Sequence, residues 1–414
     1  MEGPDTLKID SGDTAWVLAS AALVLLMTPA LGFFYGGLVR KKNALSTIMH
    51  SFFILALISV QWVLWGYSIA FGPDHFHLFG GLEWFGLNGV GLEPNKDYAA
   101  TIPHQAFMVF QMMFAVITPA LITGAFAERK RFKAFVIFTL LWATFIYDPL
   151  AHWVWSPNGW LHQLGALDFA GGTVVHISSG VSAIVCALVL GRRLGFGEEK
   201  MEPHDTTMVV LGASLLWFGW FGFNAGSALS AGGLATSAFV VTNTASAMGA
   251  LTWMTMSWWR KKQPSVIGAA CGAVAGLVAI TPASGYVNVM GSVVIGFGAG
   301  VICYAAVHLR ERTKVDDALD VFAVHGIGGT FGALATGLFA TVSINAAGGN
   351  GLFYGNPKQL GIQLVAVAAT WVWAGVGTFV ILKLVNLFVP LRVDEAEEVQ
   401  GLDVSQHGEP AYAI

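Results

Sequence analysis

Two histidines, His176 and His325, stand inside long apolar stretches of this 414-residue chain. An ionisable side chain is costly in such a stretch and, where it occurs, usually faces a pathway or a partner. An imidazole donates and accepts hydrogen bonds and exchanges a proton near neutral pH. The pair therefore indicates proton transfer, or hydrogen bonding to a small polar solute, within an apolar surrounding.

Other readings of these histidines stay open. Each ring can simply hydrogen-bond a neighbouring helix, although one histidine in each half of the chain favours a shared site. A metal site, and with it a metal-dependent membrane enzyme, is poorly supported, because two histidines lack a third acidic or thiolate ligand. The three cysteines, Cys186, Cys271 and Cys303, lie in apolar runs and read as small buried residues. We expect no metal, no cofactor and no enzymatic activity.

Two aspartates stand close before the histidines in the chain. Asp168 opens the stretch that holds His176, where its carboxylate can accept hydrogen bonds from the free N–H groups of a first helical turn. Asp320, just before the stretch that holds His325, is the expected counterpart at the opposite membrane face. We assign both a structural capping role, with direct contact to a solute as the alternative for Asp168.

The composition excludes a soluble domain. Hydrophobic residues make up 55% of the chain and charged residues only 11%, whereas soluble proteins carry roughly 25% charge. Apolar runs of about 20 residues, the length needed to cross a bilayer, recur throughout. No basic patch interleaved with aromatics suggests nucleic acid. We predict an all-α integral membrane protein with spans at about 15–37, 47–71, 104–126, 133–152, 169–190, 206–226, 236–258, 265–282, 288–308, 322–341 and 360–389.

The positive charges fall on alternate loops between these eleven spans. Because Lys and Arg are enriched in cytoplasmic loops, the pattern predicts an outer N-terminus and a cytoplasmic C-terminus. The cations on the predicted cytoplasmic side are Arg40, Lys41, Lys42, Arg129, Lys130, Arg131, Lys133, Arg192, Arg193, Lys200, Arg260, Lys261, Lys262, Arg310, Arg312 and Lys314.

An odd number of spans in each half predicts an inverted repeat, as in many transporters. We expect two five-helix repeats followed by an eleventh helix. The first apolar run is too long for a cleaved signal peptide and reads as a retained helix. The acidic tail is either a solvated, disordered end or a regulatory segment. The expected parts are an outer N-terminus (1–14), a transmembrane domain (15–389) with repeats at 15–190 and 206–341 and a last helix at 360–389, and a cytoplasmic tail (390–414).

Several motifs occur in order along the chain and resemble those of the Amt/Mep/Rh family of ammonium transporters. They are Phe33-Phe-Tyr-Gly-Gly-Leu-Val-Arg-Lys-Lys-Asn43, Gly124-Ala-Phe-Ala-Glu-Arg129, Asp168-Phe-Ala-Gly-Gly-Thr-Val-Val-His176, Trp217-Phe-Gly-Trp-Phe-Gly-Phe-Asn-Ala-Gly-Ser227, Asp320-Val-Phe-Ala-Val-His-Gly326 and Gly401-Leu-Asp-Val-Ser-Gln-His-Gly-Glu409. The resemblance covers essentially the whole chain. Trp155 together with Ser227 favours the Amt branch over the Rh branch.

The resemblance implies a role for each pore residue. Phe114, Trp155 and Ser227 would form an outer ammonium recruitment site; Phe114 and Phe223, with Phe110 beside them, would close the pore; His176, His325 and Trp220 would line it below. It also implies a homotrimer with one pore per subunit and block by a PII signalling protein of the GlnK type. Two residues depart from the family pattern: Asp148 stands where a neutral residue is expected, and Phe126 replaces a smaller aliphatic.

The predicted function is conduction of ammonium or ammonia across the cell membrane. A bare cation in an apolar pore costs tens of kcal/mol, whereas ammonium can shed its proton for about 1.4 kcal/mol per unit between its pKa and the ambient pH. We therefore expect deprotonation near the Phe gate and passage of ammonia along the histidines, with the proton following and the transport electrogenic. The alternatives are an ammonium sensor on the same scaffold and a passive Rh-like gas channel.

Overall fold

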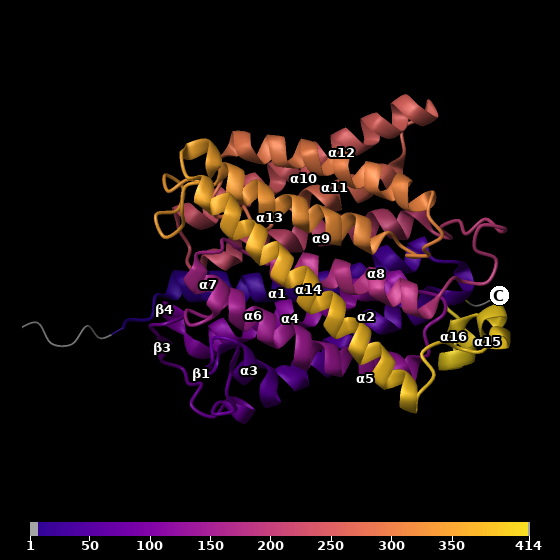
Figure 1. Cartoon of the computed structure of the whole chain (residues 1–414), viewed down its shortest axis with the longest axis horizontal. Coiled ribbons are helices and arrows are strands. Elements are labelled where there is room, and N and C mark those ends of the chain that lie inside the picture. Colours follow the sequence, from indigo (N-terminus) through magenta and orange to yellow (C-terminus); the bar gives the residue numbers. More distant parts are fainter. Residues whose placement is uncertain (1–6, 413–414) are drawn as a thin grey trace, which may run out of the picture.

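The computed structural model describes residues 7–412, and in it long helices run side by side between two ends of the molecule (Figure 1). Residues 1–6 of the predicted outer N-terminus lie outside the described part. The principal helices are α1 (Ser11–Leu38), α2 (Ala44–Gln61), α3 (Tyr67–Phe71), α4 (His104–Ile122), α5 (Phe132–Trp142), α6 (Asp148–Trp155), α7 (Trp160–Leu164), α8 (Ser178–Leu190), α9 (Thr206–Ala225), α10 (Gly233–Lys261), α11 (Val266–Ile280), α12 (Val289–Glu311), α13 (Gly328–Phe339) and α14 (Pro357–Phe388).

Four wide π turns interrupt or open these helices. Two of them join α2 to α3 and α5 to α6, and two others precede α8 and α13. Such turns are rare and are frequently found at functional sites. They are η2 (Trp62–Gly66), η5 (Ala143–Tyr147), η6 (Gly172–Ile177) and η8 (Phe322–Ile327).

Within the described residues, 10 helices are long and apolar enough to cross a membrane, and the shorter apolar helix Val266–Ile280 lies among them. The prediction of a helical membrane protein is confirmed at this level. The count of eleven, the inverted repeat and the orientation stay predictions. Several boundaries differ from the predicted ones. The first helix already begins at Ser11, where residue 15 was expected, and the stretch expected from residue 169 becomes helical only at Gly172, because Gly171 adopts a left-handed φ of 114°.

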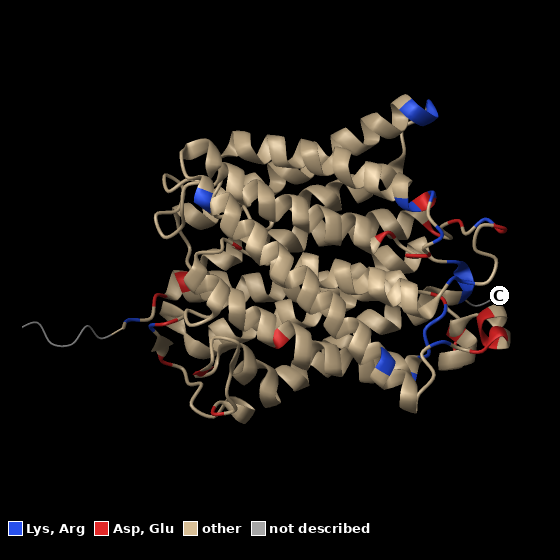
Figure 2. Cartoon of the chain, in the orientation of Figure 1, with Lys and Arg blue, Asp and Glu red and all other residues tan. Residues whose placement is uncertain are grey.

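Short β-hairpins and a polar loop cover one end of the bundle, between α3 and α4. Strands β1 (Asp74–His75) and β2 (Phe79–Gly80) pair antiparallel, as do β3 (Pro94–Asn95) and β4 (Ala99–Pro103). The C-terminus lies at the opposite end, where most Lys and Arg residues gather (Figure 2). This distribution agrees with the asymmetry expected from the loops.

Glycines let the central helices approach closely. A Cβ on Gly212 of α9 would lie 2.4 Å from the backbone nitrogen of Phe34 in α1, and one on Gly219 would lie 2.3 Å from Met27. Small residues are the usual means by which membrane helices bring their backbones together. The α1–α9 contact therefore requires glycine at both positions.

Buried ion pairs join the loops at the C-terminal end. The carboxylate of Glu128, fully buried, lies 2.8 Å from Arg40 and 3.3 Å from Arg193. Arg193 also pairs with Asp316 at 2.8 Å. Burial by itself raises the pKa of Glu128, but Arg193 and Arg40 outweigh it and hold that pKa below its usual value. Four loops far apart in sequence are thus held by one charged network.

The tail is folded and docked against these loops. Residues 395–407 form α15 (Glu395–Gln400) and α16 (Leu402–His407), which lie beyond the end of the helical bundle (Figure 1). The Asp403 carboxylate accepts the backbone N–H groups of Leu45 (3.1 Å) and Ser46 (2.7 Å) at the start of α2. This segment is therefore not a solvated, disordered tail. Its regulatory role stays a prediction.

The charged network predicts acid sensitivity. A carboxyl group whose pKa is lowered by folding stabilises the protein above its unfolded pKa, about 4.3, and loses that contribution as the pH falls. We expect the melting temperature in detergent to fall as the pH is lowered from about 5, just above the unfolded pKa, to about 3. Glu128→Gln, which leaves two arginines without their shared partner, should destabilise by about 3–5 kcal/mol and flatten the acid dependence.

Glu199→Gln is the matched control. Glu199 also faces Arg40, but its side chain is exposed and the contact is long, at 3.7 Å. Equal melting temperatures for both variants and the wild type would contradict the role given to this network.

Candidate functional site

The two histidines predicted to meet do so. Nδ1 of His325 lies 3.2 Å from Nδ1 of His176, and both side chains are buried. One proton lies between these nitrogens in a hydrogen bond. Nε2 of His176 has no hydrogen-bond partner among the described residues, so a polar solute beside this ring would find a free group.

Close backbone contact between two helices brings the rings together. His176 lies in η6 and His325 in η8, the π turns that precede α8 and α13. A Cβ on Gly180 would lie 2.1 Å from the backbone nitrogen of Gly326, so the helices cross with no side chain between them. The extra residue in each π turn shifts the ring direction away from that of a regular helix. The crossing and the turns together aim both imidazoles at one point.

Asp168 fixes the start of η6, as predicted. Its carboxylate accepts the backbone N–H groups of Gly171 (2.7 Å), Gly172 (2.6 Å) and Thr173 (2.7 Å), and also the Thr173 hydroxyl. Its remaining partner is the Val174 N–H at 3.4 Å. One buried side chain thus satisfies the donors that a helix start leaves free.

Asp320 is not the counterpart of Asp168, contrary to our expectation. The carboxylate that caps η8 is Asp317, which accepts the N–H of Phe322 at 2.8 Å. The spacing to the histidine is eight residues in both cases, Asp168 to His176 and Asp317 to His325, a signal that was present in the sequence. Asp320 instead pairs with Arg310 at 2.7 Å.

A narrow void of about 10 Å³ adjoins the histidine pair. Trp220 borders it and stacks on the His176 ring at 5.5 Å, while its Nε1–H donates to the Thr281 hydroxyl at 2.9 Å. The remaining walls are mostly aliphatic and aromatic. This volume is close to the minimum for one water-sized molecule. The void borders Met27, Leu31, Phe34, Ile117, Leu121, Val175, His176, Leu216, Trp220, Phe223, Val274 and His325.

Two phenyl rings separate this void from one end of the molecule. The Phe114 and Phe223 centroids lie 4.4 Å apart at an interplanar angle of 40°. Phe110 meets Phe114 edge-on at 5.0 Å and also borders Gly226, so it supports Phe114 from the side. Phe223 borders the narrow void, whereas Phe114 borders the larger cavity beyond it.

That larger cavity, of about 270 Å³, holds the other predicted residues. Trp155 meets Phe114 edge-on at 5.7 Å, and its Nε1–H donates to the Asp168 carbonyl at 3.0 Å. The Ser227 hydroxyl donates to the Phe223 carbonyl at 2.8 Å, which leaves its lone pairs free to accept. Aromatic faces beside a hydroxyl acceptor suit a small cation with N–H donors.

Gln111 is a cavity residue that sequence reasoning missed. It lies three residues before Phe114 on α4, borders the same cavity, and its Oε1 is buried without a partner among the described residues. Positions three apart share a helix face. A polar residue at that spacing in an apolar helix was the available signal.

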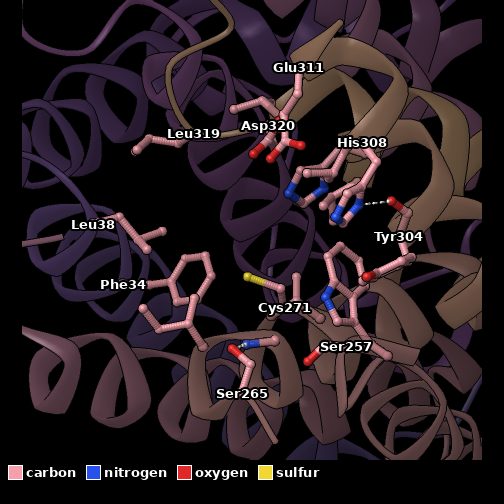
Figure 3. Close-up of a pocket in the computed structure, with 18 of the residues that line it drawn as sticks. Phe34, Leu38, Ser257, Ser265, Cys271, Tyr304, His308, Glu311, Leu319 and Asp320 are labelled. Atoms are coloured by element: carbon pink, nitrogen blue, oxygen red, sulfur yellow. Dashed lines mark hydrogen bonds between the residues drawn. The ribbon is translucent and has the colours of Figure 1, made fainter. Parts of the chain in front are cut away.

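A third cavity, of about 200 Å³, shares His325 with the narrow void as a lining residue. Figure 3 shows this cavity. It borders α1, α10, α11, α12 and the residues before η8. The three cavities thus follow one another in space. The cavity of about 270 Å³ has aromatic and hydroxyl groups in its lining, the void of about 10 Å³ is apolar apart from two imidazoles, and the cavity of about 200 Å³ has acidic side chains in its lining.

Comparisons with known proteins show which family the chain belongs to. The family model described as "Ammonium Transporter Family" matches residues 15–412. The chain belongs to this family. The "Ammonium transporter" of Bacillus subtilis (strain 168) is 55% identical over 402 residues, covering 97% of this chain and 98% of that one.

Solved structures agree equally well. Mep2 of Saccharomyces cerevisiae superposes with a TM-score of 0.89 at 39% identity, covering 94% of this chain and 89% of that one. A structure named "Sensor Amt Protein" superposes with a TM-score of 0.88 at 31% identity, covering 96% and 98%. The chain is therefore a multi-pass membrane protein of the ammonium transporter family.

The two departures from the family pattern lie away from the three cavities' linings. The buried Asp148 accepts a hydrogen bond from the Gln61 amide at 2.7 Å, and Phe126 packs among aromatic rings near His50 and Phe135. These contacts connect α2, α5 and α6. Neither residue changes the chemistry offered by the cavities.

The Asp168 cap can be tested directly. Asp168→Ala leaves several buried N–H groups without an acceptor, at about 1–3 kcal/mol each, so we expect a clearly lower melting temperature in detergent and loss of transport. Asp168→Asn keeps one acceptor oxygen and should lose less. A wild-type melting curve for Asp168→Ala would show that the cap is dispensable.

Proposed function

We propose that the protein conducts ammonium or ammonia across the cytoplasmic membrane through the three cavities in series. The observation that carries the proposal is the 3.2 Å contact between the imidazoles of His176 and His325 in a void of about 10 Å³. A hydrated ion does not fit such a void, whereas ammonia is the size of water and both donates and accepts hydrogen bonds.

Recruitment takes place in the cavity of about 270 Å³. The faces of Trp155 and Phe114 attract a cation by about 0.5–2 kcal/mol each, and the Ser227 and Gln111 oxygens accept its N–H groups. These contacts replace part of the water that surrounds ammonium. They collect the ion without carrying it through the Phe gate.

Loss of a proton lowers the free-energy cost of passing the Phe114–Phe223 gate. Moving a bare cation into apolar surroundings costs tens of kcal/mol. Two units between the pKa of ammonium and the ambient pH correspond to roughly 3 kcal/mol. Ammonium deprotonates at the Phe114–Phe223 pair, and ammonia then passes along the histidines. Potassium has no proton to lose and is excluded.

The proton follows through the histidine pair, which makes transport electrogenic. Two adjacent imidazoles titrate as a coupled pair, so they carry one added proton at a time. The proposal includes a homotrimer with one such path in each subunit and a PII-type protein of the GlnK kind as a cytoplasmic regulator. The docked tail, α15 and α16, is the segment at which such regulation would act.

A sensor on the same scaffold is the second candidate, because a structure named "Sensor Amt Protein" shares the fold over 96% of this chain. A sensor without flux would bind ammonium in the outer cavity and leave liposome uptake at background. A passive Rh-like gas channel would pass ammonia without current. Current recording and uptake on the same proteoliposomes therefore separate the three functions.

His176→Ala tests the central pair. Removing one imidazole takes away a hydrogen-bond partner worth about 1.5 kcal/mol, so we expect ammonium currents to fall about tenfold or potassium to enter. The measurement is current on reconstituted protein during ammonium and potassium pulses. His77→Ala, in the loop that carries the hairpins, is the matched control. Unchanged flux and selectivity in His176→Ala would remove the histidine pair from the mechanism.

Trp155→Leu tests recruitment. Losing one cation–π partner should raise the half-saturating ammonium concentration by about two- to thirtyfold, with a smaller effect at saturating ammonium. Trp259→Leu is the control, because Trp259 is exposed at the end of α10. An equal loss at low and high ammonium would indicate damage to the pore instead of to recruitment.

A further inference from the structure

The cavity beyond His325 has the features of a chemical site. Its volume of about 200 Å³ is large enough for an ammonium ion and several water molecules. His325 is one of the residues that line it. The side chains of Asp320 and Glu311 also line it and lie close together (Figure 3). A molecule that leaves the histidine pair therefore enters a space that contains acid–base groups.

The backbone of Asp320 is held in an unusual conformation. Its φ is +58°, in the left-handed region that residues other than glycine rarely adopt. Such outliers persist where the surrounding structure enforces them, and they cluster at functional sites. The cap on η8 belongs to Asp317, so Asp320 is not needed for that role. Its side chain is 26% exposed, toward the cavity, and carries one partner, Arg310 at 2.7 Å.

The surroundings of Asp320 bring the pKa of its carboxyl group close to neutral pH. Burial raises the pKa of this carboxyl to about 7; Arg310 opposes the rise, and the charges of Asp317 and Glu311 add to it. The other polar groups that border the cavity are Tyr35 of α1, Ser257 and Lys261 of α10, Ser265 and Cys271 near and in α11, and Tyr304 and His308 of α12. Proton donors and acceptors are most effective when their pKa is close to the working pH.

We propose that this cavity is an inner proton-transfer site, in which Asp320 takes up the proton that leaves the histidine pair and gives it to ammonia. The inference rests on the proposed function, and it assigns the residue at which ammonium forms again. Asp320 is then a catalytic residue, since its carboxyl touches the reacting nitrogen.

The transfer balances without any further reactant. The Asp320 carboxylate accepts a proton from His325 through water in the cavity, forming an O–H bond. Ammonia then accepts that proton: the O–H bond breaks, and an N–H bond forms from the nitrogen lone pair. Ammonium leaves, and the carboxylate returns to its ion pair with Arg310. His308, whose Nδ1–H donates to the Tyr304 carbonyl at 2.8 Å, offers its other nitrogen to the same space.

Asp320→Asn removes the titrating group and keeps the backbone, because asparagine also tolerates left-handed φ. Currents and ammonia uptake are measured together on proteoliposomes, with the internal pH set between 6 and 8 and a constant pH difference across the membrane. We expect the charge moved per ammonia to fall about tenfold or more in this variant at every internal pH. In the wild type the ratio should fall as the internal pH drops through about 7, because a carboxyl already protonated from the cytoplasm accepts no proton from His325.

Two neighbours provide a test that a merely structural role would not pass. Arg310→Gln removes the opposing cation, so the wild-type midpoint should move to higher internal pH. Glu311→Gln removes a negative charge that raises the pKa of Asp320, so the midpoint should move to lower internal pH. Opposite shifts support Asp320 as the titrating group even if Asp320→Asn fails to fold. Shifts in the same direction, or none, overturn the proposal.

His176→Ala distinguishes this inference from the function on which it rests. If His176→Ala abolishes coupled charge and Asp320→Asn does not, the inner site is wrong and the histidine route stands. If His176→Ala retains coupled charge, the proposed route itself fails and the inner site fails with it.

Discussion

One hydrogen bond between two imidazoles constrains the rest of the structure. For Nδ1 of His176 to reach Nδ1 of His325 across 3.2 Å, two helices must cross with their backbones in contact. Gly180 at that crossing allows the contact, since a Cβ there would fall 2.1 Å from the Gly326 nitrogen. The π turns η6 and η8 turn the rings toward each other, and Asp168 and Asp317 hold the first turns in place. A larger residue at Gly180 would separate the rings and leave two unpaired polar groups in an apolar interior.

The three spaces differ in a way that follows from solvation. The two larger cavities, of about 270 and 200 Å³, have room for water and present aromatic faces, hydroxyls and carboxyl groups. The void between them, about 10 Å³, has no room for a hydration shell. Charged species are therefore stable at both ends and costly in the middle. In the proposed route the proton and the nitrogen separate at the Phe pair and rejoin beside Asp320.

The sequence predicted the apolar helices, because the length and composition of each run determine whether it suits a bilayer. It also placed His176 beside His325, Trp155 and Ser227 around one cavity, and Asp168 at a helix start. Residue types alone could not separate Asp317 from Asp320, since both precede η8 and only the hydrogen bonds distinguish them. The docking of the tail depends on Asp403 meeting backbone groups of Leu45 and Ser46, about 360 residues away, which no local pattern encodes.

The direction of the bond between the rings has a consequence for stoichiometry. In one tautomeric arrangement His176 carries hydrogen on Nδ1 and His325 on Nε2. A proton that arrives at Nε2 of His176 moves through the shared bond and leaves from Nε2 of His325, after which each ring carries its hydrogen on the opposite nitrogen. The entry nitrogen is then occupied, so a second proton must wait until both rings return to their first tautomers. In the proposed route, such a pair therefore passes one proton and must reset before the next, which would prevent a continuous proton leak.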